Sequence, residues 1–177
     1  MAIARFKDLC IDAADPGVLG AFWAGALGLE LHTQESGDTY LTGPTKEHTV
    51  WVNRVPEPKT VKHRMHLDVA TGAVDELTAL GATVLDAESF RWTLMADPEG
   101  GEFCAFVRAP EKLTPYRVFE VVVDSVDAEA SARWWAEVFG VQASNSGEPW
   151  WWIAGAPGFP SSAVAGFWAM VFGPVPE

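Results

Sequence analysis

Hydrophobic and polar positions along the chain repeat one order of elements: a strand, a helix, then three strands. The order is clearest from residue 66 onward, where alternation predicts a short strand with His66 and Asp68 on one face. Val74, Leu77 and Leu80 then recur at helical spacing, and a glycine follows them at the position that ends helices. Residues 82–85, 91–95 and 102–107 predict three further strands, with Asp97-Pro98-Glu99-Gly100 as a type I turn before the last.

The opening residues follow the same order. Residues 4–12 predict a strand, and Asp15-Pro16 is a good helix start, with Asp as the N-cap residue and Pro in the first turn. An apolar stripe runs to residue 27, and Gly28 ends the helix. Residues 29–34, 39–42 and 49–55 predict the three strands that complete this unit.

A third unit copies the first at an offset of 112 positions. The offset places Asp15 on Asp127 and Gly28 on Gly140, and it places residues 55–57 on residues 175–177 after a short insertion around residues 159–165. Proline-containing connectors at 56–62 and 109–115 separate the three units. Internal repeats of this size predict supersecondary units that bury their apolar faces against one another.

The motifs of the second unit, in their order and spacing, carry a family resemblance. His66-Leu67-Asp68-Val69, then the helix ending in Leu-Gly-Ala82, then Asp97-Pro-Glu-Gly-Gly-Glu-Phe-Cys104 resemble the glyoxalase/bleomycin-resistance/extradiol-dioxygenase superfamily. This is the vicinal-oxygen-chelate (VOC) fold, and the nearest branch is its glyoxalase-like domain group.

The resemblance implies an α+β fold of repeated βαβββ modules that form a half-open mixed β barrel. We therefore expect one complete glyoxalase-like domain at 1–110, made of modules 1–57 and 62–110. Residues 116–177 are expected to form a third module, half of a second domain and unpaired within the chain. That module would pack on its counterpart in a second chain or on the first two modules, or the chain would be a truncated two-domain protein.

The composition narrows the classes of partner that the chain is expected to bind. The formal net charge of −12 argues against nucleic acid and anionic membranes. No apolar run approaches the ~18 residues of a membrane span. The two cysteines predict free thiols in a reducing cytoplasm, and the N-terminus lacks the apolar region of a secretory signal. Nine tryptophans favour cores, interfaces or ligand clefts.

The metal reading follows from the resemblance, because metal-using relatives take ligands from the first and last strands of paired modules. In this sequence those positions are His66 and Cys104, with Asp8, or Cys10 after a two-residue slip, in the first module. Glu102 is a second-choice carboxylate on the strand face of Cys104. This set contains one good metal ligand, one plausible carboxylate and a thiol where a carboxylate is expected, which is too few donors for a convincing metal site. No catalytic metal is therefore expected, with a divalent metal as the alternative.

For ligand binding we expect four residues, His66, Asp68, Arg64 and Trp92. Arg64 lies two positions before His66 and so on the same face of the predicted strand. Trp92 is a candidate wall of the cleft on which a ligand would stack. The sequence does not identify catalytic residues. The expected function is binding of a small organic molecule in an aromatic-lined cleft, as in bleomycin-resistance proteins, by a cytoplasmic homodimer. The alternatives are a metal-dependent lyase, isomerase or dioxygenase, and a protein that serves assembly only.

Overall fold

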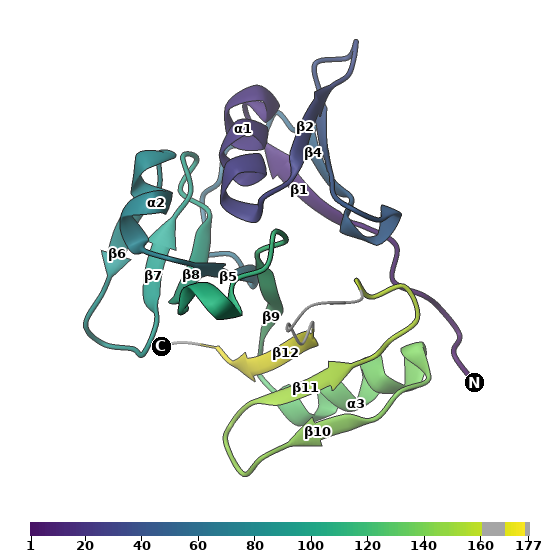
Figure 1. Cartoon of the computed structure of the whole chain (residues 1–177). Coiled ribbons are helices and arrows are strands. Elements are labelled where there is room, and N and C mark those ends of the chain that lie inside the picture. Colours follow the sequence, from purple (N-terminus) through teal and green to yellow (C-terminus); the bar gives the residue numbers. More distant parts are fainter. Residues whose placement is uncertain (161–168, 176–177) are drawn as a thin grey trace.

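The computed structural model describes residues 1–160 and 169–175 (Figure 1). The segment 161–168 and residues 176–177, which belong to the expected third module and its insertion, lie outside the described residues. Three βαβββ modules follow one another along the chain, which confirms the α+β class. No closed barrel forms from the described residues, which make one four-stranded and one eight-stranded sheet.

The first module holds β1 (Leu9–Ala13), α1 (Pro16–Leu27), β2 (Glu30–Thr33), β3 (Thr39–Thr42) and β4 (Val50–Arg54), with a 3-10 turn at Lys46–His48. Its strands form the sheet β1-β4-β3-β2. Helix α1 begins as predicted, since the Asp15 side chain accepts hydrogen bonds from the backbone N–H groups of Gly17 and Val18. It ends at Gly28, which adopts a left-handed φ of 67°.

The second module holds β5 (Met65–Thr71), α2 (Val74–Ala79), β6 (Thr83–Asp86), β7 (Thr93–Ala96) and β8 (Glu102–Val107). After a 3-10 turn at Pro110–Lys112, the third holds β9 (Val118–Ser125), α3 (Ala128–Phe139), β10 (Ala143–Asn145), β11 (Trp151–Ala154) and β12 (Ala169–Pro174). Helix α3 repeats the ends of α1, with Asp127 as its N-cap and Gly140 in the left-handed conformation. The spacing of the repeat therefore identified both helices correctly.

The modules pair differently from the expected arrangement, in which the first two form one domain and the third is unpaired within the chain. The second and third modules share one sheet, in the order β10-β11-β12-β9-β5-β8-β7-β6, through antiparallel pairing of β5 with β9. The third module thus has its partner within the chain, and the first module forms the separate four-stranded sheet. Strand edges pair through backbone groups that all sequences share, so the apolar pattern could not reveal which edges meet.

The first module contacts the second through side chains of its helix. Phe22 and Trp23 of α1 pack against Phe103 of β8, with ring centroids 5.8 and 5.3 Å from that of Phe103. All three rings are buried in one continuous core. Figure 1 shows α1 between the strands of the first module and the second module, while α3 lies against the strands of the third. The helices therefore bury one face of the eight-stranded sheet, and the side chains considered below project from the opposite face.

Candidate functional site

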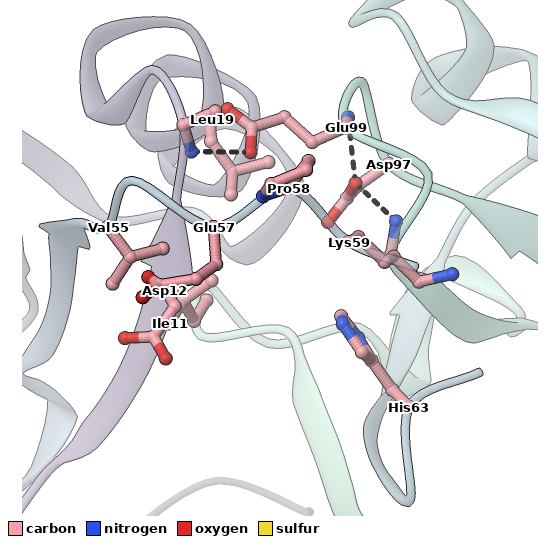
Figure 2. A pocket seen from close by; sticks show the side chains of 12 residues that line it. Ile11, Asp12, Leu19, Val55, Glu57, Pro58, Lys59, His63, Asp97 and Glu99 are labelled. Carbon is pink, nitrogen blue, oxygen red and sulfur yellow. Dashed lines mark hydrogen bonds between the residues drawn. The ribbon is translucent and has the colours of Figure 1, made fainter. Parts of the chain in front are cut away.

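Two hollows of about 220 Å³ each lie where the first module meets the second. They adjoin, because both are lined by Ile11, Asp12, His63, Asp97 and Gly101. Figure 2 shows the first, with acidic side chains on most sides and the basic groups Lys59 and His63 on one. The lining includes one tryptophan, Trp23. We expected an aromatic-lined cleft in the domain formed by these two modules. The residues that line the junction are more acidic than aromatic.

A row of polar side chains crosses the middle of the eight-stranded sheet. His66 and Asp68 lie on β5, two residues apart and so on one face. Cys104 of β8 is the register partner of Asp68 on one side, and Glu120 of β9 is its partner on the other. The neighbours Leu67 and Val69 point into the core instead. Alternation along β5 and pairing across three strands therefore bring these four groups together, and we call them the polar row.

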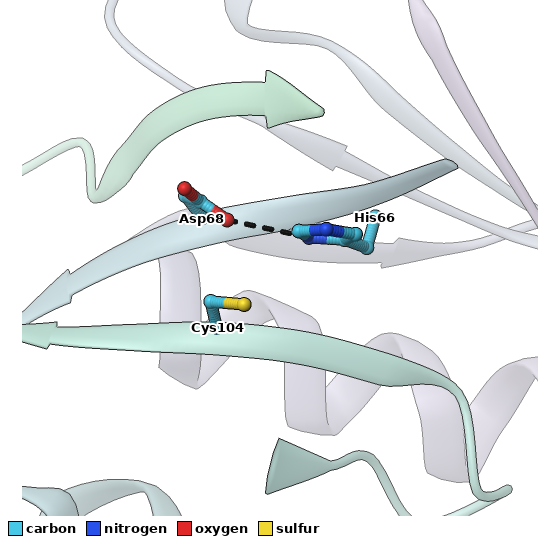
Figure 3. Close-up of side chains that lie close together, drawn as sticks. All are labelled: His66, Asp68 and Cys104. Atoms are coloured by element: carbon cyan, nitrogen blue, oxygen red, sulfur yellow. Dashed lines mark ion pairs between the residues drawn. The ribbon is translucent and has the colours of Figure 1, made fainter. Parts of the chain in front are cut away.

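Within the polar row, three groups form a tight cluster (Figure 3). Ligand atoms of His66, Asp68 and Cys104 lie within 4.8 Å of one another. His66 Nδ1 is 3.3 Å from Asp68 Oδ1, which is close enough for an ion pair. Both atoms are buried, yet neither makes a well-aligned hydrogen bond to the described residues. Buried polar atoms are nearly always satisfied, and here the ion pair between His66 and Asp68 is a contact that the two atoms make with each other.

Burial controls the acid–base behaviour of the polar row. Asp68 is 5% exposed, and burial raises the pKa of its carboxyl, while His66 opposes that shift. Burial, followed by the charge of Asp68, raises the pKa of Glu120 to about 7. The same two causes raise the pKa of the Cys104 thiol. Burial therefore opposes negative charge on both acids and on the thiol, unless a cation binds there.

Aromatic rings lie beside the polar row on the same face of the sheet. Phe106 follows Cys104 by two positions on β8, and its ring stacks on that of Trp92 at 5.5 Å. Trp92 stacks in turn on Phe90 at 5.1 Å, and Phe106 contacts Phe119 at 5.4 Å. The Arg108 guanidinium lies 5.2 Å from the ring of Phe106 and 4.7 Å from that of Phe119. We call these four rings the aromatic ladder, and it contains the tryptophan that the sequence proposed as a stacking wall.

The remaining predicted residues are engaged elsewhere. Asp8 accepts a hydrogen bond from Trp51 Nε1 at 2.9 Å and pairs with Lys7. Glu102 forms an ion pair with Lys59 at 2.9 Å and lines the second hollow beside His66. Neither acid is in the three-donor cluster found among the described residues. Arg64 is exposed in the segment before β5.

Sequence reasoning missed Glu120 as a member of the site. The signal was available in the repeat, because the offset of 112 that relates the first and third modules places Asp8 on Glu120. It went unused because the second module was expected to form a complete domain with the first. Lys62 and Asp124, which pair at 2.5 Å beside this junction, were missed for the same reason.

Comparisons with known proteins agree with this architecture. The glyoxalase-like domain model matches residues 8–106. Glyoxalase I from Zea mays superimposes with a TM-score of 0.67 at 12% identity, covering 96% of this chain and 68% of that one. A Bacillus subtilis protein described as a dioxygenase gives 0.62 at 13% identity, covering 99% and 66%. No curated protein matches the sequence.

The repeated βαβββ modules, together with the match to the glyoxalase-like domain model, place the chain in the VOC superfamily. Within that superfamily the chain belongs to the glyoxalase-like domain family, whose model covers more than half of its length. The solved structures share the fold at low identity, so they carry no information about the reaction. Among the described residues, no helix is long and apolar enough to cross a membrane.

Proposed function

We propose that this chain binds a small organic molecule against the polar-row face of the eight-stranded sheet. The observation that carries the proposal is the adjacency of two unlike surfaces on that face. The aromatic ladder offers half-exposed rings, and the polar row offers His66 Nδ1 and Asp68 Oδ1 without aligned hydrogen-bond partners. Binding sites typically combine apolar walls with a few convergent polar groups of this kind.

The aromatic ladder supplies the stacking surface. Trp92 and Phe106 are stacked at an interplanar angle of 28°, and Phe90 continues the stack at 7° to Trp92. The rings already hold one flat cation, since the Arg108 guanidinium lies over two of them. A planar aromatic ligand would extend this stack.

The polar row supplies orientation. Burial raises the pKa values of Glu120 and Asp68, that of Glu120 to about 7, so the protonated form of Glu120 can donate a hydrogen bond to the ligand. Their ionised forms would instead be stabilised by a ligand that carries an amine. A planar aromatic amine would stack on the aromatic ladder and pair with the acids of the polar row. The net charge of −12 also favours a cationic ligand over an anionic one.

The test uses the tryptophan fluorescence of the full chain, titrated with planar aromatic amines and with matched aromatic carboxylates. We expect saturable quenching by an amine, abolished in Trp92→Leu and weakened at least fivefold in His66→Ala. Trp134→Leu is the matched control, because this indole is 58% exposed on α3, outside the aromatic ladder. Loss of binding in Asp12→Asn, with full binding in Trp92→Leu, would move the ligand to the hollows and refute the proposal.

A metal-dependent lyase, isomerase or dioxygenase is the second candidate, and one observation favours it. The nitrogen, oxygen and sulfur donors of His66, Asp68 and Cys104 lie within 4.8 Å of one another, a donor set that suits zinc or iron. A divalent ion there would act as a Lewis acid on neighbouring substrate oxygens. Stoichiometric zinc, iron, nickel or manganese in purified protein, lost in His66→Ala, would establish this candidate over metal-free binding.

The proposal includes a homodimer. Its support is the outer edge of β1 on the first module, which has no strand partner among the described residues.

A further inference from the structure

Arg108 places a positive charge on the face of the sheet that carries the polar row. It follows β8 directly, and its backbone N–H donates to the Thr71 carbonyl at 2.8 Å, which extends the pairing of β8 with β5 by one residue. Cys104, Phe106 and Arg108 therefore alternate onto one face. In the described part of the chain the Arg108 guanidinium forms no ion pair and donates no hydrogen bond, so its N–H donors are available to a ligand.

Two rings of the aromatic ladder hold this charge in place. The Arg108 guanidinium lies 4.7 Å from the ring of Phe119 and 5.2 Å from that of Phe106, and the two rings contact each other at 5.4 Å. Cation–π contacts of this kind restrain a long side chain that otherwise samples many rotamers. A charge that is already restrained loses less conformational entropy when a ligand binds, so it is well suited to recognition.

A register shift in β9 brings Phe119 and Glu120 to the same face. Glu120 has a register partner on β5, whereas Phe119 is an extra residue of β9 without one. The contact between Phe119 and Phe106 places the Phe119 ring on the polar-row face, where the Glu120 carboxyl also lies. Arg108 covers the Phe119 ring and so lies beside Glu120, and its charge opposes the rise in the pKa of that carboxyl.

Opposite charges therefore lie side by side at the Phe119 end of the aromatic ladder. The Glu120 carboxylate suits an ammonium group, and the planar guanidinium of Arg108 suits a carboxylate, which it can bind with two parallel hydrogen bonds. An α-amino acid carries both of these groups on one carbon, so its charges are as closely spaced as those of the site. The stacked rings of Trp92 and Phe90 are left for an aromatic side chain.

We propose that Arg108 determines the ligand class of this face, by pairing with the carboxylate of an aromatic α-amino acid whose ammonium group pairs with Glu120. The inference rests on the proposed function, and it adds a carboxylate to the aromatic amine named there. Arg108 belongs to the second module and Glu120 to the third, so the ligand would be recognised across the junction of the two modules.

Isothermal titration calorimetry of the full chain tests this inference with three compounds that share a phenyl ring. They are L-phenylalanine, phenethylamine, which lacks the carboxylate, and 3-phenylpropionate, which lacks the amine. We expect L-phenylalanine to bind at least tenfold more tightly than either of the others, because each of them loses one charged, hydrogen-bonded pair.

Variants of Arg108 assign the carboxylate to this side chain. In Arg108→Met, which keeps an apolar stem on the two rings, the preference for L-phenylalanine over phenethylamine should disappear. Arg108→Lys should restore part of it, because lysine keeps the charge but lacks the planar fork. The ratio of the two affinities is taken within each variant, so a general loss of stability does not imitate the result.

Arg133→Met is the matched control. The Arg133 guanidinium lies 5.0 Å from the ring of Trp151, so this substitution also removes a cation–π contact, but it does so on α3, which covers the other face of the sheet. The preference for L-phenylalanine should be unchanged in this variant.

Two results would overturn the inference and leave the proposed function standing. If wild type binds phenethylamine and L-phenylalanine equally, the site recognises no carboxylate. If the preference for L-phenylalanine persists in Arg108→Met, another group binds the carboxylate. Failure of the proposed function looks different, because none of the three compounds would then bind on this face, and the inference would fall with it.

Discussion

Asp68 and Glu120 face each other as register partners across the junction of β5 and β9. One carboxyl comes from the second module and the other from the third, so neither module has this acid pair alone. Burial raises the pKa of both carboxyls, and the nearby charge of Asp68 adds to the rise for Glu120, whose pKa reaches about 7. The joint between two modules is thus also the centre of the candidate site.

We expect the unfolding free energy to fall as pH rises from about 5 to 8, and Glu120→Gln to reduce this fall. A raised pKa means that the native state holds the Glu120 proton more tightly than the unfolded chain, where the ordinary value is 4.5. Stability from this group is therefore fully present below pH 4.5 and is lost as pH rises through 7. The expected difference between wild type and variant, about 1–2 kcal/mol at pH 8, is measured by urea unfolding.

Glu129→Gln is the control for this experiment, because that glutamate is exposed on α3 and pairs with Arg133 one turn away. It should leave the slope with pH unchanged. If Glu120→Gln and Glu129→Gln show the same slope as wild type, Glu120 does not titrate with a raised pKa.

Asp68→Asn should lower the pKa of Glu120. The charge of Asp68 is a cause of the raised value, second to burial, so removing it leaves only part of the shift. The side-chain carboxyl carbon of Glu120, followed by NMR through a pH titration, reports the change directly. Asp75→Asn on α2 serves as a matched substitution, and an unchanged midpoint in Asp68→Asn would show that the two acids are not coupled.

The two thiols should differ sharply in reactivity. Cys10 is exposed, whereas Cys104 is 5% exposed and both burial and Asp68 raise its pKa. Because the thiolate is the reactive form, we expect a disulfide reagent at pH 8 to modify one thiol in native protein and two after unfolding. Cys10→Ser should abolish the native reaction. A fast native reaction in that variant would mean that Cys104 is accessible.

Glu99→Ala should loosen the contact between the first two modules. The Glu99 carboxylate accepts hydrogen bonds from the backbone N–H groups of Ala14 and Asp15, at 2.8 and 2.7 Å. It thereby ties the turn before β8 to the start of α1 and borders the first hollow. Its loss should reduce the free energy of unfolding by about 1–2 kcal/mol, measured by urea denaturation. Glu111→Ala, at an exposed turn, should change stability by less than about 0.5 kcal/mol.

The local pattern of the sequence was enough to identify the modules. Asp15 and Gly28 marked the ends of α1, Asp127 and Gly140 marked those of α3, and their equal spacing revealed the repeat. The motif around His66 carried the family resemblance that the match over residues 8–106 confirms. These features are readable because caps and apolar periodicity act over a few neighbouring residues.

The sequence by itself determined the class of fold, the repeated module and the choice of His66 as the central candidate. The tertiary structure alone decided that the second module pairs with the third, and hence that Glu120 joins Asp68 while Asp8 pairs with Lys7 and Trp51. The physical reason is that strand edges join through backbone hydrogen bonds common to every sequence. Which edges meet is settled by how whole modules pack, as when Phe22 and Trp23 of α1 pack onto Phe103 and join the first module to the second through its helix.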